Sequence, residues 1–313
     1  MSGLAAFCAG RGAEWSGFRH VRRNSGQGRI ESRGFNIPQT GTAFTYSMNR
    51  TFLNRLSLTL TAGFFLLLAQ GAVDVSRGTE SKIHLPLGMA VGALALVWAA
   101  AMKRLRPEGF LLAVTVLVAV TVSAWTGVMP SPMGKVTHAV ASHLAFALAA
   151  AGAAMTSTSW EARLAVADGG FPTLRSLAWM TPATVLVQVA LGAAYRHKMT
   201  GLIPHVSWAF VAAMFVIMTA AFTMTQCGKH PALRRISIAV ISITGIQLVL
   251  GVTALLGRVM ETPAGTGWMV VSTASHVLTG AIVLALSMAL SAQTLRHVEP
   301  AGETGLAASG QNG

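Results

Sequence analysis

Eight apolar runs, each near the length that crosses a bilayer, constrain this 313-residue chain more than any other feature. In lipid, every backbone polar group must be bonded internally, so such a run is either a helix or a strand of a closed barrel. The alternating pattern of barrel strands is absent from the sequence, which predicts an all-α integral membrane protein with eight transmembrane helices. The runs lie at about 56–74, 84–102, 109–128, 136–156, 176–194, 205–225, 236–256 and 268–292.

Composition agrees with a membrane protein and argues against a nucleic-acid-binding one. Charged residues make up 11% of the chain and hydrophobic residues 53%, against about 25% charged residues in soluble domains. The net charge of +13 comes mostly from residues between the apolar runs and in the N-terminal segment, as is typical of membrane topology. We therefore expect membrane lipid, and no nucleic acid, as a partner. The two cysteines, Cys8 and Cys227, form no metal or redox motif.

Lys and Arg residues in the loops predict the orientation in the membrane. They are more numerous after the even-numbered runs, and the N-terminal segment is rich in arginine. The positive-inside rule then places both termini in the cytoplasm and the protein in the cell (inner) membrane. We expect residues 1–50 to be a disordered cytoplasmic tail, with Met48 as a second candidate start of translation, and residues 296–313 to be a disordered C-terminal tail.

The two halves of the apolar region repeat. Gly71 and Gly192 each precede a histidine by 13 residues, and an Ala-Ser-His sequence ends at His143 and again at His276. We therefore predict two tandem four-helix bundles, related by a pseudo-two-fold axis along the membrane normal. The predicted halves span residues 51–160 and 176–295, joined by a cytoplasmic linker at 161–175.

Four histidines lie in or at the mouths of the even-numbered runs, where an ionisable side chain is costly and usually functional. Between 19 and 24 residues separate each of them from the next basic residue on the predicted cytoplasmic side, so all four should lie near the outer face. Two imidazoles from different helices can hold a haem iron from both sides. Structural zinc usually takes four protein ligands, the ligand type also permits copper, and interhelical hydrogen bonds are the alternative without metal. The four are His84, His143, His205 and His276.

The predicted outer loops carry further candidate residues. Their basic side chains can pair with haem propionates. His197 either lines the site or is an exposed loop residue, and His138 is expected to be a loop residue. Asp74 and Glu80 are either proton-handling groups or solvated, and His230 and His297 carry no signal of a site. The basic residues are Arg77, Lys82, Lys135, Arg196, Lys198 and Arg258.

On these features the chain resembles the haem A synthase family of cytochrome oxidase assembly over residues 50–295. The resemblance rests on the duplicated halves, the histidine in each even-numbered run, Gly-Ala at the end of the first and fifth runs and Arg196-His197 after the fifth. It implies that His84 and His143 hold a substrate haem O in the first half. It also implies that His205 and His276 hold haem B in the second half.

The same resemblance implies an activity and a set of partners. The activity is oxidation of a methyl group of haem O to give haem A. The expected partners are a haem O-producing enzyme, a quinol or ferredoxin-type electron donor and a second copy of the chain.

The chain departs from the family in two features of its first outer loop. The family's long loop with a cysteine pair is absent, and Ser81 stands three residues before His84, where the family has a glutamate. Glu80, one residue further back, is then the expected catalytic carboxylate. Two alternatives stay open: a non-catalytic b-type haem electron carrier or assembly factor, and a proton-coupled transporter whose histidines relay protons. The carrier predicts haem B alone, and the transporter predicts no haem absorbance.

Overall fold

The computed structural model describes residues 40–300 except 80, 162–165, 170 and 264, so most of both predicted tails lies outside the described residues. Within that part, eight helices are long and apolar enough to cross a membrane, and the protein is a multi-pass, all-α membrane protein as predicted. The helices are α1 (Thr40–Arg77), α2 (His84–Leu105), α3 (Phe110–Gly127), α4 (Pro132–Thr156), α5 (Leu174–Arg196), α6 (Leu202–Cys227), α7 (Pro231–Val259) and α8 (Gly267–His297).

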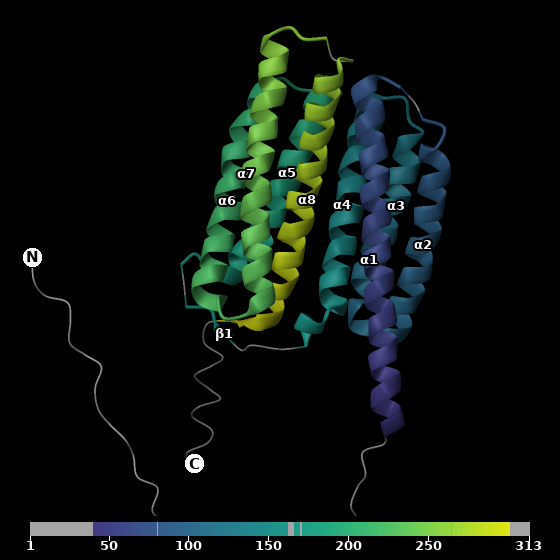
Figure 1. Cartoon of the computed structure of the whole chain (residues 1–313), viewed down its shortest axis with the longest axis vertical. Coiled ribbons are helices and arrows are strands. Elements are labelled where there is room, and N and C mark those ends of the chain that lie inside the picture. Colours follow the sequence, from purple (N-terminus) through teal and green to yellow (C-terminus); the bar gives the residue numbers. More distant parts are fainter. Residues whose placement is uncertain (1–39, 80, 162–165, 170, 264, 301–313) are drawn as a thin grey trace, which may run out of the picture. The chain divides into compact units, whose positions relative to one another are not determined.

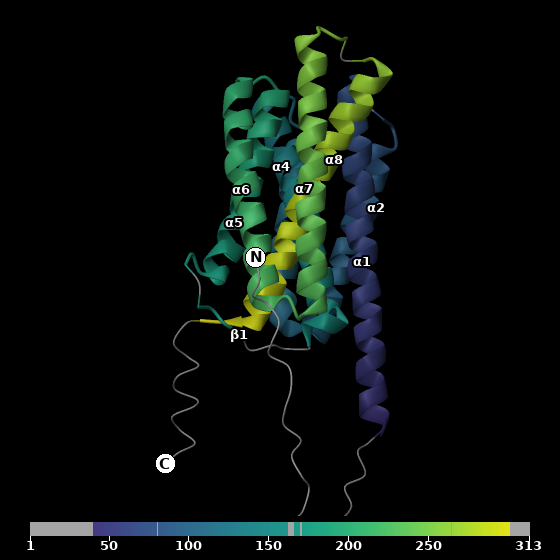
Figure 2. The same ribbon diagram turned by 60° about the vertical axis from the view of Figure 1, so that its left-hand side comes forward.

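Helices α4 and α8 form the centre of the bundle. Within its most apolar window, 56% of α4 and 44% of α8 is buried, against 11–28% for the other six helices. Figures 1 and 2 show α4 and α8 side by side, with α1–α3 on one side and α5–α7 on the other. Alanines recur along both helices, for example Ala145 and Ala149 in α4 and Ala281 and Ala285 in α8. Side chains this small allow two helices in a membrane to pack closely.

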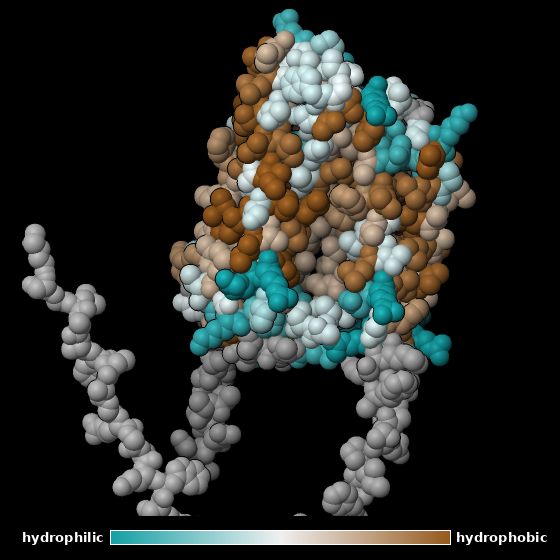
Figure 3. Space-filling model, in the orientation of Figure 1, coloured by the Kyte–Doolittle hydropathy of each residue, from teal (hydrophilic) through white to brown (hydrophobic). Residues whose placement is uncertain are grey.

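The outer surface of the bundle is apolar around its middle. Leu111 is 77% exposed, Phe210 74% and Val249 66%, which would be costly in water. Figure 3 shows this apolar surface along the helices and hydrophilic residues gathered towards their ends. The distribution is the one that a lipid environment requires, with polar groups where the chain meets water.

Local capping sets where several helices begin. The Ser131 hydroxyl accepts a hydrogen bond from the Gly134 backbone N–H (3.0 Å), and Pro132 fits the first turn of α4. The buried Asp168 carboxylate accepts hydrogen bonds from the Leu174 and Arg175 backbone N–H groups at 2.8 and 2.9 Å. Its negative charge lies at the positive end of the α5 dipole, which stabilises this helix start.

The segments outside the predicted helical halves are partly regular. Helix α1 begins at Thr40, inside the segment predicted as a tail. Strand β2 (Val298–Glu299), in the predicted C-terminal tail, pairs in parallel with β1 (Val166–Ala167), in the predicted linker. Two short 3₁₀ turns, Pro107–Gly109 and Thr158–Trp160, lie in connections at the same end of the bundle.

Candidate functional site

Four glycine–histidine contacts lie at the end of the bundle where the odd-numbered helices finish and the even-numbered ones begin, here called the histidine end. Each odd-numbered helix presents a glycine to the histidine of the next helix. A Cβ atom at the glycine of α3, α5 or α7 would lie 2.8–2.9 Å from an imidazole atom, and one at the glycine of α1 would lie 3.2 Å away. The contacts are Gly71 with His84, Gly127 with His138, Gly192 with His205 and Gly251 with His276.

The second-half pair is His205 from α6 and His276 from α8, the two residues that the resemblance also places together. Their ring centres lie 6.2 Å apart, and the ring planes are close to perpendicular at 85°. The His276 Nδ1–H donates to the Gln247 carbonyl oxygen at 3.2 Å, and the side-chain amide of Gln188 lies 3.1 Å from His205 Nδ1. The Gln247 contact orients the His276 ring and leaves its Nε2 as the electron-pair donor, and the backbone carbonyl of Gln188 bonds to the His205 ring.

The first-half pair is His84 from α2 and His138 from α4, with ring centres 6.1 Å apart and ring planes tilted by 59°. The structure thus pairs His84 with His138, expected to be a loop residue, rather than with His143. The His138 Nδ1–H donates to the Ser123 carbonyl oxygen at 2.9 Å. The Ser123 hydroxyl lies 2.8 Å from that of Ser142, which fixes α3 against α4 beside the ring.

His143 faces another way because five residues along a helix correspond to a rotation of about 140° from His138. The side chain is buried, and its Nδ1–H donates to the Ala139 carbonyl oxygen at 2.7 Å. Its ring also lies against the backbone of Val277 in α8, the residue after His276. This is the interhelical packing role that the sequence left open for such a histidine.

Asp74 is the described carboxylate beside the first-half pair. It lies one turn beyond Gly71 in α1 and accepts hydrogen bonds from the Gln70 side-chain amide (3.0 Å) and the Ser81 backbone N–H (3.3 Å). Its charge lies close enough to act on the His84 ring. Glu80, the carboxylate expected to be catalytic, lies outside the described residues.

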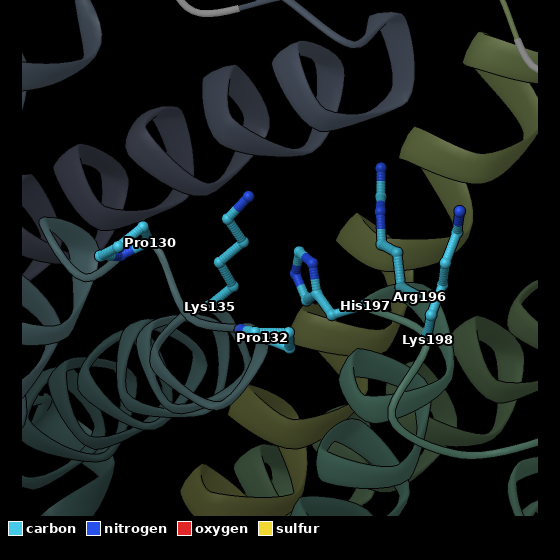
Figure 4. Close-up of a pocket in the computed structure, with 6 residues that line it drawn as sticks. All are labelled: Pro130, Pro132, Lys135, Arg196, His197 and Lys198. Carbon is cyan, nitrogen blue, oxygen red and sulfur yellow. The ribbon is translucent and has the colours of Figure 1, made fainter.

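A cavity of about 210 Å³ opens at the histidine end and is here called the cation cavity. Pro130, Pro132, Lys135, Arg196, His197 and Lys198 line it. Figure 4 shows Lys135, His197 and Arg196 next to one another with their side chains pointing the same way. Lys198 has a left-handed backbone φ of 61°, which is uncommon for a residue with a side chain. Arg77 is exposed at the end of α1 and does not line this cavity.

Arg196 connects the two halves at the cation cavity. Its guanidinium donates to the Ala72 carbonyl oxygen (3.2 Å) and the Ser76 hydroxyl (2.7 Å) of α1. The Thr273 hydroxyl of α8 donates to the same Ser76 oxygen at 3.1 Å. Ser76 thus receives hydrogen bonds from two helices of the other half.

The cation cavity is electropositive. Ion pairs between described residues involve Glu108 and Glu161, which belong to connections at the opposite end of the bundle. Burial lowers the pKa of the His197 imidazole, and the positive charges of Arg196 and Lys135 lower this pKa further. The cavity therefore favours an anion and keeps His197 neutral near pH 7.

His230 and His297, which carried no signal of a site, form a close pair at the opposite end. Their ring centres lie 4.4 Å apart, and both side chains are buried. The His230 Nδ1 accepts the Leu233 backbone N–H at 3.3 Å, and the His297 Nε2 lies 3.0 Å from the Gln293 side-chain oxygen. These contacts cap α7 and fix the end of α8, which are structural roles.

The histidine end thus offers two imidazoles at each of two positions. Among the described residues, no three histidine, cysteine or acidic side chains gather closely enough to hold a metal ion by themselves. Two ligands are sufficient where a planar macrocycle supplies the other donors, as in haem proteins. No protein-family model matches this sequence, and no curated protein matches it.

Proposed function

We propose that the protein is a haem-binding membrane oxidoreductase of the haem A synthase type, which oxidises a methyl group of haem O to give haem A. The observation that carries the proposal is the second-half pair, whose ring centres lie 6.2 Å apart. A metal–nitrogen bond of about 2.0 Å, plus about 1.15 Å from nitrogen to ring centre on each side, would separate the two centres by about 6.3 Å. This spacing supports one iron held between His205 and His276.

The surroundings of the second-half pair also suit haem B. The Gln247 carbonyl takes the Nδ1 proton of His276, so Nε2 carries a lone pair, which accepts from the Gln247 side-chain amide at 3.4 Å and would bind iron in its place. Gly192 and Gly251 have no Cβ atom and so leave room for the imidazoles, which the Cβ atom of any other residue would crowd. When bound, haem B supplies a one-electron redox couple tuned by its two axial ligands and its apolar surroundings.

The first-half pair is the proposed place of the substrate, haem O. His84 and His138 would hold it, since their 6.1 Å separation is close to that of the second-half pair. Oxidation of a methyl group releases protons, and the Asp74 carboxylate is placed beside His84 to accept one. Asp74 thus takes the part that the sequence assigned to Glu80.

The cation cavity is the proposed contact for the haem propionates. Lys135, Arg196 and Lys198 supply positive charge there, and a carboxylate bonded to a cation gains a charge-assisted hydrogen bond. The neutral imidazole of His197 adds a hydrogen-bond donor or acceptor at the cation cavity. Haem edges pointing to this end would keep the macrocycle's apolar part between the helices.

We place the protein in the cell (inner) membrane, with both termini in the cytoplasm and the haem sites near the outer face. Lys103 and Arg104 end α2, on the side opposite the histidines, as the positive-inside rule expects for the cytoplasmic side. The proposed partners are a haem O-producing enzyme, a quinol or ferredoxin-type electron donor, membrane lipid and a second copy of the chain.

One observation favours a second candidate, a non-catalytic b-type haem electron carrier or assembly factor. Ser81 stands where the resemblance expects a glutamate, and its backbone N–H is bonded to Asp74. If no carboxylate accepts protons from the substrate, two bis-histidine haems would serve electron transfer alone.

Haem extraction and mass analysis of the purified protein, with a pyridine haemochrome spectrum, tests the proposal. The protein is expressed with and without a haem O-producing enzyme. Haem A, or a hydroxylated haem O, found only with that enzyme supports the synthase, whereas haem B alone in both preparations supports the carrier. His276→Ala should remove the low-spin b-type spectrum, and Ser275→Ala, the preceding residue in α8, should retain it. Absence of haem from the wild type would overturn both candidates.

A further inference from the structure

We infer that the two sites differ in ligand lability: the first-half site releases His84 and admits a small external ligand, whereas the second-half site stays closed. The inference rests on the proposed haem-binding function. It concerns a difference between histidines that the sequence presents as equivalent.

Three of the four histidines are anchored by the residue four positions before the glycine that they contact. Ser123 provides the carbonyl oxygen for His138, and Gln247 does the same for His276, at 2.9 and 3.2 Å. The backbone carbonyl of Gln188 likewise bonds to the His205 ring. An imidazole held through Nδ1 keeps its orientation and is a stronger ligand through Nε2.

His84 lacks this anchor. The residue four positions before Gly71 is Leu67, and its carbonyl oxygen makes no hydrogen bond to the His84 Nδ1. The His84 Nδ1 is buried and has no hydrogen-bond partner among the described residues. The ring is therefore the least constrained of the four, and its bond to a metal would be the weakest.

The backbone of His84 is also the least constrained. His84 is the first residue of α2, whereas His205 is the fourth residue of α6 and His138 and His276 lie deeper in their helices. The residue before it, Ile83, provides no side-chain cap, and the His84 N–H meets the Ser81 carbonyl oxygen at 3.3 Å. A first turn without a cap frays most easily, so this ring can move aside with its backbone.

Release of His84 would give the first-half site the open position that oxidation by dioxygen requires. Asp74, the neighbouring carboxylate, would stay in place because its bonds to Gln70 and Ser81 do not involve the ring. The second-half site, with both rings anchored, would stay limited to electron transfer. The ligand class is thus a small neutral diatomic molecule at the first site alone.

Carbon monoxide binding to the full-length, haem B-loaded, dithionite-reduced protein in detergent tests the inference. About half of the bound haem should take up carbon monoxide if both sites are loaded. The informative variant is Leu67→Gln, whose side-chain amide oxygen can accept the His84 Nδ1 proton and so supply the missing anchor. It should slow carbon monoxide binding roughly tenfold or more, since ligand anchors of this kind are worth 10–100-fold in metal affinity.

The matched control is Gln188→Leu, which removes a side-chain amide but keeps the backbone carbonyl that bonds to His205, so the second-half haem should stay unreactive towards carbon monoxide. A retained low-spin spectrum and a single gel-filtration peak identify variants that are folded. If none of the bound haem in the wild type reacts with carbon monoxide, the inference is overturned while haem binding still stands. Unchanged carbon monoxide kinetics in the folded Leu67→Gln variant would also overturn it, and a wild type without haem would instead overturn the proposed function.

Discussion

A single methyl group is the smallest change that tests the histidine sites, because each imidazole rests against a glycine Cα. Interiors are packed closely enough that a contact below 3 Å forces a neighbour to move. In α7, Gly251 touches His276, whereas Gly245 has nothing within 4 Å of its missing Cβ. One helix thus carries a sensitive and an insensitive glycine.

We expect Gly251→Ala to displace the His276 ring and weaken haem binding in the second half by roughly 10–100-fold. The added Cβ would lie 2.9 Å from the ring Cε1. Gly245→Ala should keep the haem and raise helix stability by up to about 1 kcal/mol. Haem titration followed by absorbance measures both, and equal affinities in the two variants would contradict the packing argument.

His197 should make the stability depend on pH. Its pKa in the folded protein is lowered, chiefly by burial and then by Arg196 and Lys135, relative to about 6.5 in the unfolded chain. Below that value the unfolded chain binds the proton first, so the stability present at pH 7.5 is lost as the pH falls towards the folded-state pKa. The midpoint temperature of thermal unfolding in detergent should therefore fall more steeply between pH 7.5 and pH 5.5 in the wild type than in His197→Gln. Parallel curves would exclude this role for His197.

At the scale of the helices, the sequence predicts most of the architecture and less of the site. The membrane-spanning helices are predictable because apolar length alone determines them. The rotation of α4 about its own axis is not predictable from the sequence, because it depends on how α4 packs against α8. The Ala-Ser-His repeat therefore favours His143, although His138 is the histidine that faces His84. The sequence offers both Asp74 and Glu80 as proton-handling groups, and the position of Asp74 three residues beyond Gly71, on the same face of α1, favours Asp74.

The rotation of α4 can be tested by replacing each of its two histidines in a separate variant. His138→Gln should remove the first-half haem and leave the second-half spectrum, so that the haem content falls by about half. His143→Gln should keep both haems, because its ring bonds to Ala139 within α4 rather than facing His84. Haem-to-protein ratios measure both variants. A larger loss in His143→Gln than in His138→Gln would mean that the resemblance, and not the observed pairing, identifies the ligand.

At the scale of the whole molecule, charge is unevenly divided between the two ends of the bundle. The ion pairs of Arg50 and Arg106 with Glu161 belong to the end opposite the histidines. At the histidine end, Lys135, Arg196 and Lys198 face a cavity without such a partner among the described residues. A membrane protein can hold cations without acidic partners where a bound anion neutralises them. The proposed propionate contact would therefore lie on the side of the membrane that the histidine end faces.

The orientation itself is testable by cysteine labelling in intact cells. In a Cys8→Ser/Cys227→Ser background, Lys82→Cys marks the histidine end and Glu108→Cys the opposite end, and both positions are exposed. A membrane-impermeant maleimide should label Lys82→Cys directly and Glu108→Cys only after permeabilisation, since the basic connections stay inside. Reversed labelling would move the histidine end to the cytoplasm. The proposed electron donor would then have to deliver its electrons from the cytoplasmic side.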